Sequence, residues 1–143
     1  MSDANLFMVT MVVPDCDQAI AHFTNDWGFV LANDTHHASG KRWIEIAPAG
    51  GARLRLAEAN CPEQTAAIGR QTGGLVSFFL KTHDFDTDVS NWLARGITML
   101  EPERQEPYGR IVVLADVYGN RWDVIEADEG PTESMVSAQR MQR

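Results

Sequence analysis

Residues 13–28 read VPDCDQAIAHFTNDWG, and this stretch decides how the chain is expected to fold. The residues before Pro14 are rich in Val, Met and Thr, which predicts a strand that ends at the proline. Asp15 or Asp17 can then cap a helix that ends before Gly28, a residue suited to the position after a helix. Apolar residues recur at helical spacing along one face of that helix, at Ile20, Phe23 and Trp27.

The same pattern returns in residues 82–96, which read THDFDTDVSNWLARG. Asp84 and Asp86 stand at the head of the second helix as Asp15 and Asp17 do in the first, and a glycine again follows the helix. An ordered set of matches on this scale indicates an internal repeat, and a repeat determines the architecture. Each half predicts the order strand, helix, strand, strand, strand.

Each half is completed by three further strands after its helix. The predicted strands cover residues 6–13, 29–32, 43–47 and 53–56, then 75–81, 97–100, 111–115 and 121–126. One helix covers only one face of four strands, so two units set side by side would share an eight-stranded sheet. We therefore predict an α+β fold in which two tandem βαβββ modules form a curved mixed sheet around a cleft. The predicted single domain is 1–126, with modules at 6–57 and 74–126, a connector at 58–73 and a polar tail at 127–143.

The composition predicts a soluble globular protein. The 143 residues are 44% hydrophobic, and 20 Asp and Glu against 12 Lys and Arg give a formal net charge of −8. Phosphate contacts need clustered Lys and Arg, so we expect neither a nucleic acid nor an anionic membrane as a partner. No apolar run reaches the ~20 residues that span a bilayer. The first residues lack a basic signal-peptide region, and two isolated cysteines make no disulfide framework, so we expect a cytoplasmic protein.

Three motifs make the chain similar to a known family. They are Val12-Val13-Pro14-Asp15 before the first helix, Trp27-Gly28-Phe29 at its end, and Asp116-Val117-Tyr118-Gly119-Asn120 near the last strand. Through these motifs and the repeat, the chain resembles the vicinal oxygen chelate superfamily, also called the glyoxalase/bleomycin-resistance/dioxygenase family. The last motif is similar to that family's Asp-Pro-Asp-Gly-Asn block. The resemblance implies paired βαβββ modules and a homodimer, but it leaves the function open, because members range from metal-dependent enzymes to metal-free drug-binding proteins.

The resemblance also implies where a metal would bind. In the family's metalloenzymes, four ligands come from the first, fourth, fifth and eighth strands, which here places Met8, Arg55, Ser77 and Asp123 at those positions. Of these, only Asp123 suits a hard divalent ion, since a thioether is soft and Ser77 is a poor neutral ligand. The Arg55 guanidinium keeps its proton and repels a cation. We therefore expect no metal and no other cofactor, the alternative being a divalent metal that involves Asp123.

Strand alternation predicts which side chains face the cleft. Arg55 and Asp123 would either pair across it, or Arg55 would receive an anionic or carbonyl group of a ligand. Trp43 would either stack on a flat ligand or fill cavity or interface volume. The candidate ligand-binding residues are Met8, Trp43, Arg55, Ser77, Phe79, Tyr108 and Arg110.

Acid–base candidates are few. Glu45 and Asp123 are cleft-facing carboxylates, and His37 would either reach the cleft mouth or remain a solvated loop histidine. Tyr108 precedes Gly109 and Arg110 in a segment that would form either a rim contact or a tight turn with the tyrosine packed as a lid. We take Glu45, His37 and Asp123 as the catalytic candidates.

Three functions are compatible with these residues. The first is a metal-independent protein of the bleomycin-resistance type that binds a small organic molecule. The second is a lyase, isomerase or dioxygenase that acts on a small carbonyl or aromatic substrate, and the third is a dimeric interaction module without chemistry. The net charge favours a cationic ligand. Several basic residues are nevertheless assigned to cleft-facing strands or their entrances, which weakens that preference: Arg53, Arg55, Lys81, Arg110 and Arg121.

Overall fold

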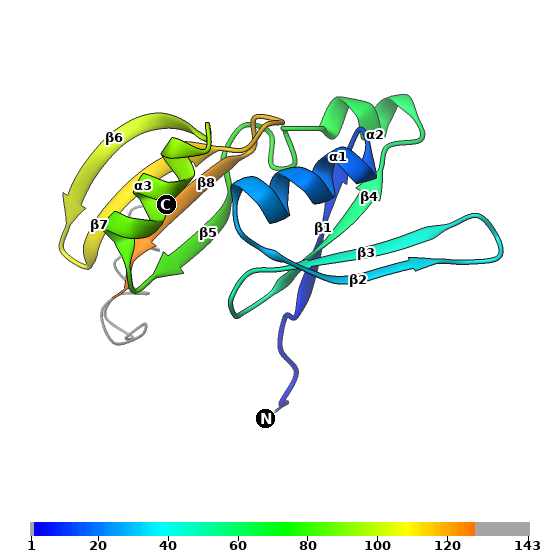
Figure 1. Ribbon diagram of the computed structural model, residues 1–143, viewed down its shortest axis with the longest axis horizontal. Helices are drawn as coiled ribbons and strands as arrows, with labels where there is room; N and C mark the ends of the chain where they lie inside the picture. Colours follow the sequence, from blue (N-terminus) through cyan, green and yellow to red (C-terminus); the bar gives the residue numbers. More distant parts are fainter. Residues whose placement is uncertain (1, 128–143) are drawn as a thin grey trace. The chain divides into compact units, whose positions relative to one another are not determined.

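The chain forms two compact units that repeat one topology. The computed structural model describes residues 2–127, and the units divide the chain into Met1–Gly73 and Gly74–Arg143. Within residues 2–127, each unit holds one helix and four strands in the order βαβββ, with a further short helix in the first unit (Figure 1). The predicted α+β class and the internal repeat are therefore confirmed. No helix among residues 2–127 is long and apolar enough to cross a membrane.

The first unit is a mixed four-stranded sheet with β1 and β2 at its edges. Its elements are β1 (Met8–Val13), α1 (Cys16–Ala21), a π-helical turn η1 (His22–Asp26), β2 (Val30–His36), β3 (Arg42–Ala47), β4 (Arg53–Glu58) and α2 (Pro62–Ala67). The strand order is β1-β4-β3-β2, with β1 parallel to β4 and the other pairs antiparallel. The short helix α2 lies in the predicted connector.

The helical segment formed by α1 and η1 starts and ends where the sequence indicates. The backbone of Asp15 is extended, and its carboxylate accepts a hydrogen bond of 2.8 Å from the Gln18 amide, which satisfies one of the free donors of the first turn. After η1 the chain turns at Gly28, whose φ of 79° favours glycine. The buried side of the first unit holds stacked aromatic rings and alternating strand residues, namely Phe23, Trp27, Phe29, Met11, Val13, Ile44, Ile46, Leu54 and Leu56.

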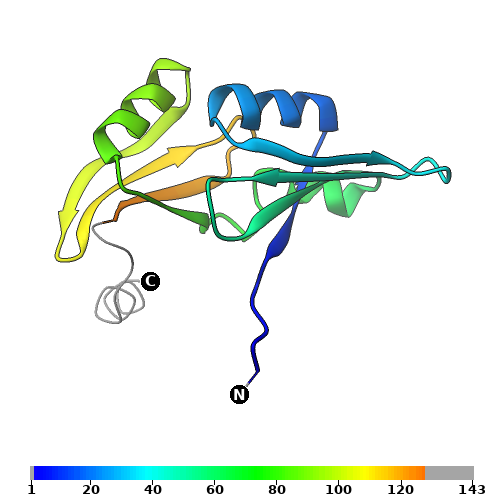
Figure 2. The same ribbon diagram turned by 60° about the horizontal axis from the view of Figure 1, so that its bottom comes forward.

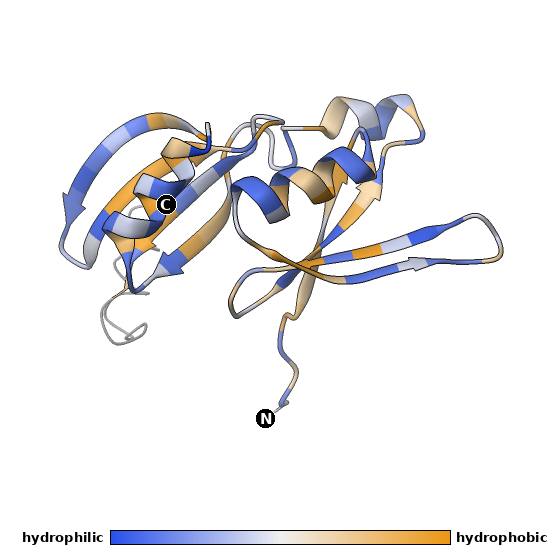
Figure 3. Ribbon diagram, viewed as in Figure 1, coloured by the Kyte–Doolittle hydropathy of each residue, from blue (hydrophilic) through white to orange (hydrophobic). Residues whose placement is uncertain are grey.

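The second unit repeats this order in a second four-stranded sheet. Its elements are β5 (Val76–Thr82), α3 (Phe85–Ala94), β6 (Thr98–Glu106), β7 (Gly109–Ala115) and β8 (Arg121–Glu126). The strand order β5-β8-β7-β6 matches that of the first sheet (Figure 2). Strands β7 and β8 are almost entirely buried, and Figure 3 shows β7 as mostly hydrophobic beside the more hydrophilic edge strand β6. The predicted sheet of eight strands is thus built as two hydrogen-bonded sheets of four.

The head of α3 differs from the capping that the repeat predicts. Asp84 occupies the cap position, but its side chain makes no capping hydrogen bond. Thr82 supplies the contacts instead, because its hydroxyl accepts from the Asp84 amide at 2.9 Å and donates to the Asp88 carboxylate at 2.5 Å. The two helix starts therefore share a sequence pattern and differ in the group that satisfies the backbone.

Two edge strands are longer than predicted. β2 continues to His36 and β6 to Glu106, whereas the apolar pattern ends at residues 32 and 100. The outer halves of both strands are polar on both sides and have no buried face. They remain strands because backbone hydrogen bonds to β3 and β7 hold them in place. Pro102 is tolerated in β6 because it lies where the register with β7 shifts. Of the predicted polar tail, residues 128–143 lie outside the described part of the chain.

Candidate ligand-binding face of the first sheet

One face of the first sheet carries a polar row that crosses all four strands. The apolar residues of β3 and β4 point to the buried side that includes α1, so the intervening residues point to the opposite face, which we call the polar face. Cα partners across the strands give a continuous row of Thr10 on β1, Arg55 on β4, Glu45 on β3 and Asn33 on β2. Trp43, Arg53 and Met8 extend the polar face on either side of this row.

The centre of the polar face is a stacked pair of Arg55 and Trp43. The guanidinium carbon lies 4.4 Å from the centre of the indole ring, which is cation–π distance. The indole is held in position because its Nε1 donates a 2.8 Å hydrogen bond to the Glu45 carboxylate. Within residues 2–127 Arg55 makes no ion pair, and its buried Nε atom has no hydrogen-bond partner. The guanidinium is therefore placed and charged, and its terminal Nη groups, rather than the buried Nε, are the donors left for a further group.

Glu45 has the opposite character, because its carboxylate is fully engaged. Besides the bond from Trp43, Oε1 accepts from Arg53 at 3.0 Å and Oε2 accepts from the Asn33 amide at 3.4 Å. The hydrogen bonds from Trp43 and then Arg53 hold the pKa of Glu45 below its ordinary value, in spite of partial burial. An ionised carboxylate with three donors is a weak proton acceptor, so the geometry gives Glu45 a positioning role. Its predicted catalytic role remains untested.

The remaining predicted residues of the first unit are spread out. Met8 lies on the polar face as the Cα partner of Arg53. His37 is exposed in the turn between β2 and β3, where its backbone N–H donates to the Lys41 carbonyl at 2.8 Å. It is four residues beyond Asn33, or about 13 Å along an extended chain, so the structure does not bring it to Glu45. This location matches the loop-histidine alternative.

Two predicted residues of the second unit are neighbours across β5 and β8. Phe79 and Asp123 are Cα partners, and the Phe79 side chain is 52% exposed whereas Asp123 is completely buried. Ser77 lies at a register shift between Val76 and Phe78. The predicted convergence of Ser77 and Asp123 with Met8 and Arg55 remains a prediction of the resemblance.

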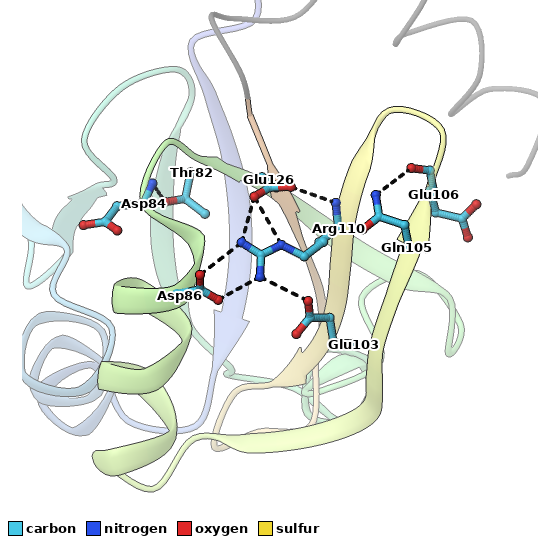
Figure 4. Close-up of polar contacts among 8 residues, drawn as sticks. All are labelled: Thr82, Asp84, Asp86, Glu103, Gln105, Glu106, Arg110 and Glu126. Atoms are coloured by element: carbon cyan, nitrogen blue, oxygen red, sulfur yellow. Dashed lines mark hydrogen bonds and ion pairs between the residues drawn. The ribbon is translucent and has the colours of Figure 1, made fainter.

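Arg110 lies on the helix side of the second sheet, which corrects its predicted place at the cleft. Figure 4 shows its guanidinium between Asp86 at the head of α3 and Glu126 of β8. The shortest distances to both carboxylates are 2.8 Å, Glu103 of β6 lies 3.3 Å away, and the guanidinium carbon lies 4.7 Å from the Phe85 ring centre. Hydrogen bonds from Arg110 hold the pKa values of Asp86 and Glu126 below their ordinary range.

The first unit repeats this arrangement, which sequence reasoning missed. Arg42 of β3 occupies the position of the repeat that Arg110 occupies in β7, and it pairs with Asp17 of α1 and Asp34 of β2 at 2.8 Å each. Each unit thus ties the first turn of its helix to its third strand. The signal was present in the sequence as matched arginines accompanying Asp17 and Asp86.

Tyr108 forms the turn between β6 and β7 with Pro107, and the predicted role of its side chain, as a rim contact or a packed lid, stays a prediction. Gly109 follows with a φ of 134°, and a Cβ atom there would lie 2.8 Å from the Glu126 carbonyl oxygen. The glycine is therefore required by the close approach of β7 to β8.

The motif Asp116–Asn120 has a structural explanation. The Asp116 carboxylate is buried and accepts hydrogen bonds from the Tyr118 and Asn120 amides, the Asn120 side chain and the Trp122 indole, all between 2.9 and 3.0 Å. One buried carboxylate with four donors fixes the turn that starts β8. This function of Asp116 was not foreseen from the sequence.

The residues that stand at the family's metal positions do not suit a divalent cation on the first sheet. Arg55 presents a permanent positive charge on the same face of the sheet as the soft thioether of Met8. In the part of the chain that the structure describes, no three His, Cys, Asp or Glu side chains come together in a group able to hold a metal ion.

Comparisons with known proteins agree with the fold. A relative from Shewanella frigidimarina (strain NCIMB 400), described as uncharacterized, is 40% identical over 124 residues, which cover 85% of this chain and 92% of the relative. The structure of UcmS2 has a TM-score of 0.74 at 23% identity and covers 87% of this chain and 98% of its own. TnmS3, an antibiotic binding protein from Streptomyces sp. CB03234, has a TM-score of 0.70 at 25% identity and covers 90% and 99%.

The decisive match covers most of the chain. A model of the Glyoxalase/Bleomycin resistance protein/Dioxygenase superfamily matches residues 5–124, a span that contains the polar face and every strand of both βαβββ units except the last two residues of β8. The chain therefore belongs to the Glyoxalase/Bleomycin resistance protein/Dioxygenase superfamily.

Proposed function

We propose that this protein binds a small organic molecule on the polar face of the first sheet, without the divalent metal of the family's metalloenzymes. The observation that carries this proposal is the stacked pair of Arg55 and Trp43. Arg55 has hydrogen-bond donors without partners among residues 2–127, and Trp43 is fixed by Glu45. A rigid aromatic ring beside uncommitted polar donors is typical of small-molecule sites.

Binding explains the chemistry of this face better than catalysis does. Proton transfer needs a group whose pKa is near the working pH and whose proton site is accessible. Glu45 has a lowered pKa and three donors already on its carboxylate, and His37 lies well away from it. Glu45 instead immobilises Trp43 and neutralises Arg53, which leaves one uncompensated positive charge on Arg55. Preorganised groups of this kind raise affinity, because little freedom is lost on binding.

The comparisons supply a precedent for this proposal. TnmS3 is described as an antibiotic binding protein, and its fold extends over 90% of this chain. A protein of similar fold with that function supports binding as a role for the present fold.

A binding screen on metal-stripped protein tests the proposal. The protein is dialysed against EDTA, and a panel of cationic, neutral and anionic organic compounds is screened by thermal shift and confirmed by calorimetry. We expect at least one class to bind with micromolar affinity, and the Arg55→Met variant to lose that binding. Arg70→Met, which removes an exposed arginine of the same unit, is the matched control and should bind as the parent does. Absence of binding by every class, or binding that requires added metal, would contradict the proposal.

We also propose that the protein is a cytoplasmic homodimer. Large apolar side chains are exposed in both units, at Leu6, Phe7, Val30, Leu31, Leu75 and Phe79, which supports burial against a second copy. Light scattering should then give twice the chain mass of 15.9 kDa. A monomer mass at micromolar concentration would argue against the dimer.

A further inference from the structure

We infer that the molecule bound at Arg55 is a flat organic anion: a conjugated ring system that carries a carboxylate or an equivalent oxyanion. This inference rests on the proposed function and specifies the ligand of the same site. It follows from the distribution of charge on the polar face, from the donors beside Arg55, and from the ring that supports its guanidinium.

The charge of the site selects against cations, although the whole chain carries −8. The polar face carries two arginines and one carboxylate, and that carboxylate, Glu45, is neutralised by Arg53 at 3.0 Å. A cationic ligand would meet Arg55 and would find no carboxylate oxygen of Glu45 without a donor already on it. An anion would gain an ion pair with a guanidinium that has none within residues 2–127. The local charge therefore outweighs the net charge in selecting the ligand.

A second donor stands beside Arg55. Thr10 is its Cα partner on the neighbouring strand β1, at about 4.8 Å in the hydrogen-bonding direction. The threonine is exposed, and its hydroxyl makes no hydrogen bond to the described residues. A guanidinium and a hydroxyl on adjacent strands can share the two oxygens of one carboxylate, with the guanidinium donating two N–H groups and the hydroxyl a third hydrogen bond.

The shape of the ligand follows from Trp43. Its ring lies against the guanidinium and is locked by the hydrogen bond to Glu45, so the face beside the anion site is aromatic and rigid. Aromatic rings bind flat conjugated groups by offset stacking and bind bulky saturated groups less well. The thioether of Met8, on the same face, adds a polarisable contact for such a ring. A flat ring system with one oxyanion could contact all of these groups at once, with the oxyanion at Arg55 and Thr10 and the ring against Trp43 and Met8.

A matched set of probes tests the inference on the full-length, EDTA-treated protein. The probes are 2-naphthoate, its neutral isostere 2-naphthamide, the cation 2-naphthylmethylammonium and the saturated anion decalin-2-carboxylate, each titrated by calorimetry at pH 7 and low salt. We expect 2-naphthoate to bind at least about tenfold more tightly than the amide or the saturated anion, and the cation not to bind. The affinity for 2-naphthoate should also fall with rising salt.

Three variants locate the binding. Arg55→Met should abolish the preference for 2-naphthoate over the amide, and Thr10→Val should weaken 2-naphthoate binding by about three- to tenfold. Arg55→Lys keeps the charge without the fork of donors, so it should retain part of the preference even if Arg55→Met folds poorly. Circular dichroism verifies the fold of each variant.

The outcomes separate the two proposals. Equal or tighter binding of the amide, the saturated anion or the cation would overturn the flat-anion inference while leaving small-molecule binding intact. Binding of 2-naphthoate that is unchanged in Arg55→Met would also overturn it. If no naphthalene probe binds but another class in the broader panel does, the inference is wrong and the proposed function stands. If nothing binds, both fail.

Discussion

Arg55 is the cross-strand partner of Glu45, yet it is Arg53 that pairs with that carboxylate, while Arg55 lies over Trp43 with its guanidinium carbon 4.4 Å from the ring centre. The two arginines lie on one face of β4, two residues apart, and make different contacts. One fixes the site by neutralising Glu45, and the other is left charged for a ligand.

Replacing Trp43 should weaken ligand binding without unfolding the protein, because the ring is only partly buried and lies on the polar face. We expect Trp43→Leu to lower affinity by about three- to thirtyfold, the range of a cation–π contact together with lost stacking. Trp43→Phe keeps a ring under Arg55 but cannot donate a hydrogen bond to Glu45, so its affinity should lie between those of the parent and Trp43→Leu. Calorimetry with 2-naphthoate measures all three, and equal affinities would show that the ring takes no part.

Glu45→Gln should reduce affinity through loss of order. The substitution removes the charge that holds Arg53 and weakens the acceptor for Trp43, so the guanidinium of Arg53 becomes free and the indole mobile. We expect about a threefold to tenfold loss in binding, with a larger unfavourable entropy in calorimetry. Glu63→Gln, an exposed glutamate of α2, is the control and should change nothing. If affinity rises in Glu45→Gln, the simple removal of negative charge matters more than the positioning.

The ion pairs of Arg110 with Asp86 and Glu126 should make stability depend on pH in the acid range. The pKa values of Asp86 and Glu126 are lowered by Arg110, so their stabilising contribution is present at neutral pH and is lost as the pH falls below the ordinary value of 4.5 for Glu and through the folded values. Arg110→Met should therefore lower the Tm by a few degrees at pH 7, and the difference from the parent should narrow in acid.

A single exposed ion pair supplies the control for that experiment. Arg121→Met removes a guanidinium that lies 3.7 Å from the Glu101 carboxylate at the surface. Such a pair contributes little, so this variant should unfold within about a degree of the parent. An Arg110→Met Tm deficit that stays constant from pH 7 to pH 3 would show that lost packing on Phe85, rather than charge, explains the effect.

Gly109→Ala should destabilise the second unit strongly. The added Cβ would lie 2.8 Å from the Glu126 carbonyl oxygen, and a φ of 134° is unfavourable for alanine, which together predict a loss of about 2 kcal/mol or more in the free energy of unfolding. Gly50→Ala is the matched control, because its added Cβ would meet nothing within 4 Å and its φ lies outside the positive range. Urea denaturation measures the free energy of unfolding of both variants. If Gly109→Ala changes that free energy no more than Gly50→Ala does, β7 and β8 separate easily.

Much of the fold is readable from the sequence because repeated apolar spacing and glycines mark both helices. The edge strands β2 and β6 were underestimated, since residues such as Asn33 and Glu103 carry no burial pattern and are held only by backbone pairing. Arg110 was misplaced because a long side chain at the start of a strand can serve either face. Its partners on α3 and β8 decide the matter, and they are distant in sequence.

The face on which three of the candidate residues lie could be predicted from the sequence, but their contacts could not. Alternation correctly placed Trp43, Glu45 and Arg55 on one face of the sheet. It could not show which arginine would pair with Glu45, because the choice depends on diagonal reach and on the indole that competes for Arg55. The sequence does not distinguish an arginine that is paired with a carboxylate, such as Arg53, from one that makes no ion pair among residues 2–127, such as Arg55. The two can be told apart only from their contacts in the structure.

The most direct test of ligand binding at Arg55 is the affinity of EDTA-treated protein for 2-naphthoate, measured side by side in the parent, Arg55→Met and Arg70→Met. We expect the parent and Arg70→Met to bind 2-naphthoate with equal affinity, and the affinity of Arg55→Met to be lower by at least about tenfold. Equal affinity in all three proteins would contradict the claim that the polar face of the first sheet binds its ligand through the free guanidinium of Arg55.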